Sequence, residues 1–270
     1  MTALRAYADA AQAILARDFA LFASYRSRFV TTLFSTAVGL TLFYYVSRLV
    51  TSPRVGSSDD YYAFVVVGLI VFSVLTSTLS LPVATLRQEL LVGTFERMVL
   101  SPFGAVRSVI SLMLFPLLLA LVTSSISLLY AALVFGLDLR WPEALLGLPV
   151  ALLGAVAFAP FGLLMTAAVV VYKQTNAGAT FVITGITFLS GVYFPVSLLP
   201  DWIRWASEVQ PFTPAIDLLR HLLVDTPLRG SLELELAKLV LFPAVMMPLA
   251  VLALTAAVRR GRRRGNIIEF

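Results

Sequence analysis

YYAFVVVGLIVFSVLTSTLSLPVA, residues 61–84, is the stretch that decides the fold, because it contains no acidic or basic side chain. A helix needs about 20 predominantly apolar residues to cross the hydrocarbon layer of a membrane. Inside lipid, the backbone amide and carbonyl groups must also bond to one another, which a helix achieves within the segment. The stretch therefore predicts a transmembrane helix.

The composition of the whole chain supports the same environment. Of its 270 residues, 59% are hydrophobic and 13% charged, whereas a soluble domain has about 25% charged residues. The net charge of +5 does not indicate nucleic-acid binding, since the basic residues lie at the ends of apolar blocks and in the tail, residues 259–270. A basic run beside a span is typical of the cytoplasmic membrane face. The chain has no cysteine, which excludes disulfides and thiol chemistry.

Six apolar blocks approach or exceed the length of a membrane span. We therefore predict an all-α membrane protein, a single transmembrane domain over residues 1–270 with a six-span bundle over 29–258. The fifth block is the least uniform, because Gly185, Gly191 and Pro195 could bend or shorten it. The blocks are 29–47, 61–84, 108–136, 144–171, 178–197 and 238–258.

Residues 3–22 predict an N-terminal amphipathic helix. Leu4, Tyr7 and Phe22 belong to a set of apolar residues at helical spacing, with Arg5 and Arg17 among the polar residues between them. We expect this helix to lie along the membrane surface. The alternative is an ordinary solvated helix that packs on a partner.

Basic residues also predict the orientation, because cytoplasmic loops carry an excess of Lys and Arg. With an even number of spans, both chain ends lie on the same side of the membrane. The larger group of Lys and Arg residues falls on that side. It includes Arg87, Arg97, Arg107 and the arginines of the tail. The sequence therefore predicts that both termini lie in the cytoplasm.

The sequence contains little reactive chemistry. Ion-coupled transporters and channels keep ionisable groups at membrane depth, but the second and third blocks carry none, and neither does the sixth after Lys238. His221 is the only histidine, which excludes a multi-histidine metal site, and we expect it to be structural. No catalytic triad, carboxylate pair or phosphate-binding glycine loop is visible. We therefore predict no enzyme, no metal site and no cofactor in this chain, and a source of energy outside it.

The segment between the second and third blocks, residues 89–102 and called the inner segment, reads ELLVGTFERMVLSP. On one helix, Glu89 and Glu96 would share a face, with Gly93 between them where a partner's backbone could approach. Apolar residues would anchor this helix, and Ser101-Pro102 would end it. The pattern predicts a short helix parallel to the membrane that a cytoplasmic partner can grip. A plain amphipathic loop helix is an equal alternative from the pattern alone.

The segment from Ser190 to Arg220, called the outer segment, is too apolar for a solvated loop. Pro200 and Pro214 suit the first turns of two short helices, and tryptophan suits the headgroup level. We interpret the segment as two half-helices that enter the outer leaflet, tied by an Asp217–Arg220 pair. The alternative is an extracellular cap on the bundle. Its marked residues are Gly191, Phe194, Pro195, Pro200, Trp202, Pro211, Asp217 and Arg220.

At these two segments the chain resembles a known family. The run Glu-x-x-x-Gly-Thr-Phe-Glu followed by Ser-Pro is similar to the coupling-helix segment of the ABC type-2 membrane family of exporter permeases. The run Ser-Gly-x-x-Phe-Pro, Leu-Pro-x-Trp, Pro-x-Thr and Arg resembles the segment between that family's fifth and sixth spans. The resemblance covers nearly the whole chain in order.

The resemblance implies an exporter subunit of a bacterial cytoplasmic (inner) membrane. Its partners would be two copies of an ABC ATPase, which bind the ATP and Mg²⁺, a second copy of this chain or a related permease, and membrane lipids. No nucleic acid is implied. The residues carried over to the ATPase contact are Glu89, Gly93, Thr94, Glu96, Arg97, Ser101 and Pro102.

The resemblance also implies a dimer seam at the first and fifth spans and a substrate path along the second and fifth. From helical faces, the candidate path residues are Phe72, Thr76, Thr180, Thr184 and Phe188. The cargo would be amphiphilic, such as a lipid, drug, secondary metabolite or lipid-linked glycan. Family members that export long glycans usually have a tryptophan before the first span, and residues 24–29 have none. The competing classes are an ion-coupled carrier or channel, and a membrane enzyme or scaffold.

Overall fold

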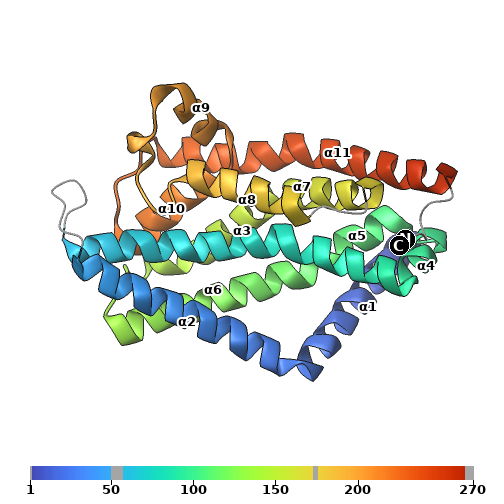
Figure 1. Cartoon of the computed structure of the whole chain (residues 1–270), viewed down its shortest axis with the longest axis horizontal. Helices are drawn as coiled ribbons and strands as arrows, with labels where there is room; N and C mark the ends of the chain where they lie inside the picture. Colours follow the sequence, from blue (N-terminus) through green and yellow to red (C-terminus); the bar gives the residue numbers. More distant parts are fainter. Residues whose placement is uncertain (1, 50–56, 173–175, 265–270) are drawn as a thin grey trace.

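The computed structural model describes residues 2–49, 57–172 and 176–264, and every regular element in these ranges is a helix. The helices form an elongated bundle (Figure 1). In chain order they are α1 (Thr2–Ser24), α2 (Arg26–Leu49), α3 (Ser58–Val92), α4 (Thr94–Leu100), α5 (Ala105–Leu112), α6 (Leu114–Phe135), η1 (Glu143–Leu146), α7 (Gly147–Tyr172), α8 (Asn176–Ser190), η2 (Val196–Leu198), α9 (Asp201–Val209), α10 (Phe212–Val224) and α11 (Leu232–Arg264).

Five helical stretches are long and apolar enough to cross a membrane, and each covers one of the predicted spans, the third except for its last residue. This result confirms the first, second, third, fourth and sixth predicted spans as helical stretches of sufficient length. The last of them continues as helix through Arg264, so the part of the predicted tail up to this residue is not a separate segment. The five stretches are Phe29–Leu49, Ser58–Val92, Ala105–Phe135, Glu143–Tyr172 and Leu232–Arg263.

The predicted fifth span, residues 178–197, is wrong in its extent. The helix α8 ends at Ser190, because Gly191 takes the left-handed conformation with φ of 79°, which only glycine adopts without strain. With 15 residues, α8 is about 22 Å long, shorter than a hydrocarbon layer of about 30 Å. The structure therefore does not confirm a sixth full span.

Local sequence explains where the other long helices begin and end. Ser57 caps α3, and its hydroxyl accepts a bond from the Asp60 amide while the Asp60 carboxylate accepts one from the Ser57 amide. The third span divides at Met113 into α5 and α6. Pro116 explains this break, since it has no amide hydrogen to give to the carbonyl of Leu112.

The bundle is held together by α7, which packs mainly against α11 and α3. Pro82 lies inside α3 and has no amide hydrogen to give to the carbonyl of Thr78. That carbonyl faces Gly162 of α7, where an added Cβ would lie 2.8 Å from the Thr78 oxygen. The absence of a side chain at Gly162 therefore lets the two helices come into close contact.

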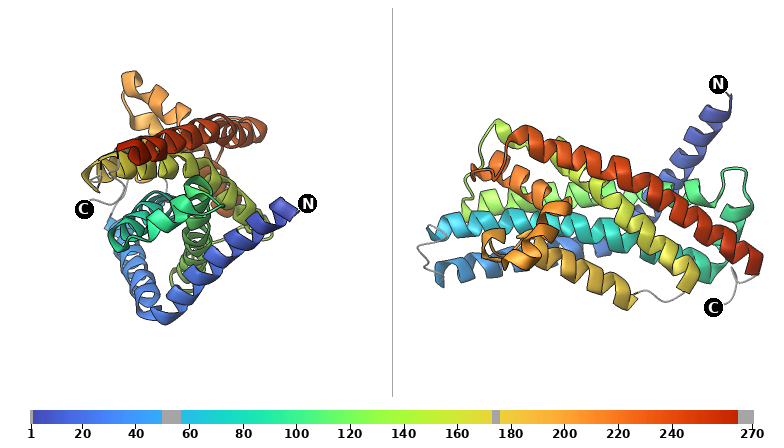
Figure 2. Two further views of the ribbon diagram at one scale, coloured as in Figure 1. Left: turned by 90° about the vertical axis from the view of Figure 1, so that its right-hand side faces the viewer. Right: turned by 90° about the horizontal axis from the view of Figure 1, so that it is seen from above.

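The two ends of the bundle differ. α4 lies at one end, together with the start of α1 and the end of α11, whereas α9 and α10 lie at the other (Figure 1). α2 runs along the outside of the bundle (Figure 2). Its apolar side chains are largely exposed, including Phe34 and Leu42 at 70% and 60%.

Gly162→Ala is expected to destabilise the protein by about 1–3 kcal/mol, because the new methyl group would press on a backbone carbonyl that cannot move aside. The measurement is thermal unfolding of the purified chain in detergent. Gly39→Ala on α2 is the matched control: nothing lies within 4 Å of its added Cβ, so we expect no loss of stability there. Equal melting temperatures for the two variants would contradict this account of the α3–α7 contact.

Candidate coupling site and outer segment

The inner segment consists of the last turn of α3, a glycine joint and α4. Gly93 ends α3 with φ of 77°, and α4 then starts at Thr94. The prediction that Glu89 and Glu96 share a face of one helix is therefore wrong, because the left-handed joint separates them. A separate short helix is present, and Ser101 ends it; its contact with a cytoplasmic partner stays a prediction.

α4 is anchored on one side and open on the other. Phe95 and Val99 are 1% and 8% exposed, and they pack in a core cluster with side chains of α3, α5, α7 and α11. Glu96 and Arg97 are exposed, and Leu100 is 70% exposed. The helix therefore presents a mixed charged and apolar face from a rigid base.

Ser101 and Pro102 shape the end of the inner segment. The Ser101 hydroxyl donates to the Met98 carbonyl (2.9 Å) and accepts from the Gly104 amide (3.3 Å). Pro102 is exposed. These bonds close the turn that leads from α4 into α5.

Glu89 does not point at a free surface, because it is held by α1. Its Oε1 lies 2.8 Å from Nη1 of Arg17, and its other carboxylate oxygen accepts a bond from the Thr94 hydroxyl. The same hydroxyl donates to the Glu89 carbonyl (3.2 Å). Arg17 also contacts Asp18 (2.9 Å). A charge cluster of Arg17, Asp18 and Glu89 thus joins α1 to the joint between α3 and α4.

Burial affects the protonation of this cluster. It raises the pKa of the Asp18 carboxyl, and the charge of Glu89 adds to the rise, although Arg17 opposes it. Burial alone would lower the pKa of Arg17, but its bonds to the two carboxylates raise it. Arg17 therefore stays a cation that holds two acidic groups together.

A second contact of α1 lies nearby. The guanidinium of Arg107 on α5 lies over the Tyr7 ring, 4.0 Å from its centre, and Tyr7 also contacts Phe103 (6.0 Å between ring centres). The predicted residues 3–22 lie within α1, which packs against the end of the bundle that carries α4. Its position on a membrane surface stays a prediction. The sequence pattern did not predict Arg17 as a partner of Glu89; the Arg17-Asp18 doublet near the end of an amphipathic helix was the available signal.

The outer segment contains two short helices, α9 and α10. Pro200 and Pro211 immediately precede them, and Pro214 lies in the first turn of α10. α10 is mostly buried, whereas Trp202 on α9 is 75% exposed. Phe194 packs edge-on against Phe188 (5.4 Å between ring centres). The entry of these helices into a lipid leaflet stays a prediction.

Arg220 is the most unusual residue of the outer segment, because its side chain is only 1% exposed. Its guanidinium donates to the carbonyls of Phe64 (2.9 and 3.1 Å), Gly191 (3.0 Å) and Val192 (3.0 Å). It also lies over the Phe64 ring, 3.3 Å from the centre. Arg220 thus joins α10 to α3 and to the turn that follows α8.

The predicted Asp217–Arg220 pair is wrong. Asp217 instead pairs with Arg229 (3.2 Å), outside the outer segment. Residues three apart on a helix do share a side, but here the carbonyls at the end of α8 take the donors of Arg220. Gly68 leaves room for this arrangement, since an added Cβ there would lie 2.5 Å from the Val192 oxygen and 2.9 Å from Nη2 of Arg220.

The candidate path residues lie on two helices. Phe72 and Thr76 are part-buried on α3, and the Thr76 hydroxyl bonds to the carbonyls of Phe72 and Ser73. Thr180, Thr184 and Phe188 are exposed along one side of α8. Neither of the two cavities described for the chain is lined by any of the five. Their role in a path stays a prediction.

Within residues 2–49, 57–172 and 176–264, no group of three or more His, Asp or Glu side chains could hold a metal ion. His221 bonds to the carbonyl of Thr226 (3.1 Å).

Comparison with known proteins decides the family. The model of the family described as ABC-2 type transporter matches residues 9–224, a range that includes both the inner and the outer segment. The chain belongs to this family. It is a transmembrane permease subunit, and its apolar helices make it a multi-pass membrane protein.

Individual relatives of this ABC-2 permease match over different lengths. Nodulation protein J of Sinorhizobium fredii is 35% identical over 111 residues, which are 41% of this chain and 42% of that protein. Nodulation protein J of Rhizobium leguminosarum bv. trifolii is 39% identical over 88 residues, 33% of this chain and 34% of that protein. The chain thus spans less than half of these relatives. The inner membrane transport permease YadH of Escherichia coli is 25% identical over 201 residues, 71% of this chain and 75% of that protein.

We expect the Arg17–Glu89 contact of the permease to contribute about 1 kcal/mol, because both side chains are partly shielded from water. A double-mutant cycle of Arg17→Met and Glu89→Gln, followed by thermal unfolding, measures this coupling energy. Hydrogen exchange should also quicken in α1. Arg5→Met, an exposed change on the same helix, should leave both readouts unchanged. A coupling energy of zero would show that α1 is held by other contacts.

Arg220→Met is expected to destabilise the permease by about 3 kcal/mol or more, because it leaves several buried carbonyls without a donor. Arg220→Lys should be intermediate, since a single ammonium group cannot reproduce the planar fork. The measurement is the melting temperature in detergent. The control is Arg48→Met, which removes a pair with Asp59, itself 71% exposed; such pairs contribute about 0–1 kcal/mol. A loss no larger than the control's would refute the structural role of Arg220.

Proposed function

We propose that this permease is half of an ATP-driven exporter in a bacterial cytoplasmic membrane, with both chain ends in the cytoplasm. Two ATPase subunits would bind and hydrolyse the ATP with Mg²⁺, and a second permease would complete the transmembrane part. The cargo would be an amphiphilic molecule: a lipid, drug, secondary metabolite or lipid-linked glycan. The family implies an ATPase partner, and the YadH relative is named as an inner membrane permease.

The observation that carries the proposal is the build of α4. A helix that transmits force must be anchored on the side that faces the bundle and accessible on the opposite side. The helix α4 combines buried Phe95 and Val99 with exposed Glu96 and Arg97. The charged groups would guide the fit to the ATPase surface, and Leu100 would supply apolar contact. Glu89 would act differently, by fixing α1 and Thr94 in place beside this surface.

The second permease would pack on α2 and α8. Both helices carry large exposed apolar residues, such as Phe34 on α2 and Phe181 on α8, at 70% and 81% exposure. Such surfaces mark either lipid contact or a protein interface. In the proposed dimer they would enclose the path, and Thr180, Thr184 and Phe188 would line it only once the second copy is present.

The proposed cycle uses α3 to carry the motion. When the two ATPases close on ATP, each α4 would move with its ATPase and carry with it the end of α3 that adjoins α4. The cavity between the permeases would then change the side to which it opens. The outer segment would lie at the outer leaflet and close the path on that side.

Glu96→Lys tests the proposal. Reversal of an exposed charge at an interface places like charges together, so we expect co-purification of the ATPase and ATP-coupled transport to fall about tenfold or more. Glu208→Lys is the matched control, the same change on an exposed residue of α9 at the opposite end, and should leave ATPase binding unchanged.

Intact transport and ATPase binding in Glu96→Lys would refute the coupling role of α4. The alternative function is an ion-coupled secondary transporter or channel. Gradient-driven uptake or conductance in liposomes that contain this chain alone would favour that alternative.

A further inference from the structure

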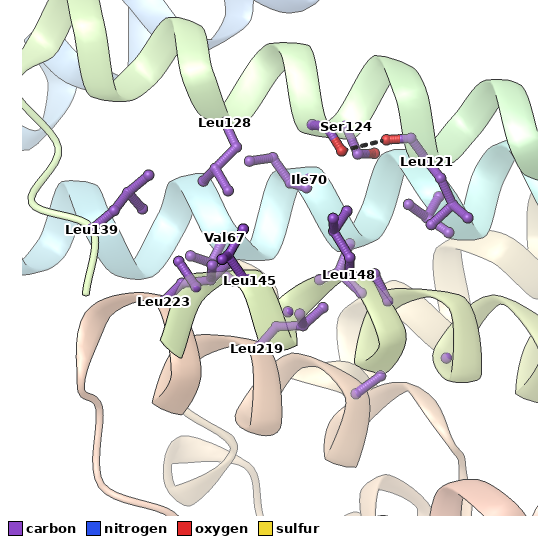
Figure 3. A pocket seen from close by; sticks show the side chains of 18 of the residues that line it. Val67, Ile70, Leu121, Ser124, Leu128, Leu139, Leu145, Leu148, Leu219 and Leu223 are labelled. Atoms are coloured by element: carbon purple, nitrogen blue, oxygen red, sulfur yellow. Dashed lines mark hydrogen bonds between the residues drawn. The ribbon is translucent and has the colours of Figure 1, made fainter. Parts of the chain in front are cut away.

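A cavity of about 240 Å³ lies between α3, α6, α7 and α10. It is in the half of the bundle that contains α10, and Figure 3 shows its walls. Val67 and Ile70 come from α3, Leu128 from α6, and Leu219 and Leu223 from α10. None of the residues that line it belongs to α2 or α8, so it is separate from the proposed seam and path.

The lining of this cavity is almost entirely hydrocarbon. Its side-chain hydroxyls are those of Ser124 and Ser125. The Ser124 hydroxyl bonds to that of Ser73 (3.2 Å), and the Ser125 hydroxyl donates to the Leu121 carbonyl (2.9 Å). Both groups therefore have partners in the protein and do not call for a polar ligand.

Water does not suit this space. One water molecule needs about 10–15 Å³ of such volume and two to four polar partners. At about 240 Å³, the cavity has room for many waters but offers them almost no hydrogen bonds. An occupant made of CH₂ groups would instead contact the walls on all sides and gain the dispersion energy that an empty space forfeits.

The cavity opens sideways, towards lipid. Leu129, Leu145 and Leu148 line it and are 52%, 57% and 52% exposed, on helical stretches long and apolar enough to cross a membrane. The space is too small for a helix of about 10 Å diameter. The apolar material that surrounds such an opening in a membrane is the acyl chains of the bilayer.

Charged side chains adjoin the cavity at the loop that carries Leu139 and Trp141. Arg140 is between Leu139 and Trp141, which both line the cavity, and its side chain is 43% exposed. Arg140 forms ion pairs with Asp225 and, at 3.8 Å, with Glu143. A guanidinium beside two carboxylates matches the phosphate and ammonium of a phospholipid headgroup.

We propose that this cavity is a binding site for one bilayer phospholipid, with an acyl chain between α6 and α7 and the headgroup at Arg140. The acyl chain would lie against Leu219 and Leu223, on the helix that also carries Arg220. A bound lipid would therefore support α10 while Arg220 holds it to α3 and to the end of α8. The site is independent of the exporter proposal, because it needs only a membrane around the bundle.

The chain allows a direct test, because Trp141 lines the cavity and the other two tryptophans, Trp202 and Trp205, lie on α9. In the full-length chain carrying Trp202→Phe and Trp205→Phe, Trp141 is the only indole. The protein is purified, stripped of lipid and titrated at fixed detergent with phosphatidylcholine brominated in mid-chain. We expect quenching of Trp141 fluorescence that saturates near one lipid per chain.

Ala151→Phe in this background would fill the cavity, so the saturable quenching should fall about threefold or more. The matched control is Ala244→Phe, the same change at an exposed position of α11 outside the cavity, which should leave it unchanged. If Ala151→Phe does not purify as a folded protein by size-exclusion chromatography, Ala151→Leu provides a smaller filling with a smaller expected loss.

Two results would overturn the proposal. One is quenching that rises without saturation, or that saturates equally in the Ala151 and Ala244 variants, which would mean general solvation by lipid or detergent. The other is efficient cross-linking of two chains through Leu148→Cys, the only cysteine in the variant, in membranes. That result would make this face a contact between two copies of the chain.

Discussion

The buried guanidinium of Arg220 is the interaction on which the arrangement of the bundle depends. Within a lipid-embedded bundle, irregular backbone is tolerated only where its polar groups find partners inside the protein. The chain leaves the helical path at Gly191, where the carbonyls of Gly191 and Val192 have no helical partner, and Arg220 supplies their donors. The same side chain bonds to Phe64 on α3. One residue thus places α8, α10 and α3 relative to each other.

The helix α3 connects this arrangement to the opposite end of the molecule. It has 35 residues and is therefore about 52 Å long, with Phe64 and Gly68 near one end and Glu89 near the other. Arg220 holds the first end, while Arg17, Thr94 and the α4 anchor hold the second. A displacement of α4 would therefore be felt at the outer segment through a single helix, which is the arrangement that a coupled permease needs.

Neither of the two cavities described above is lined by a candidate path residue, and this fits a machine whose path lies between two copies. The exposed apolar faces of α2 and α8 lie on the side of the molecule where such a copy would be placed. The lipid-facing cavity lies elsewhere, between α6 and α7. In these proposals the molecule would use different sides for different partners: ATPase, second permease and lipid.

Much of the molecule follows from the sequence by itself. Long runs without charge must be helices in lipid, so residues 61–84 and the other long blocks determined the all-helical class, and the two segments with their motifs determined the family. Ser57, Gly93 and Pro116 set local boundaries through bonds made within a few residues. Such local rules can be inferred because the partners are near in the chain.

Only the tertiary structure decided how distant groups are paired. Arg220 lies 156 positions from Phe64, and no periodicity indicates that its donors go to backbone carbonyls and not to Asp217. Glu89 was expected at a partner's surface, yet it bonds to Arg17 on a helix that precedes the first span. The length of α8 likewise depended on whether Gly191 turns the chain, and that turn is stabilised by a residue 29 positions later. These choices depend on which donors the folded bundle brings to each acceptor, which the local sequence does not specify.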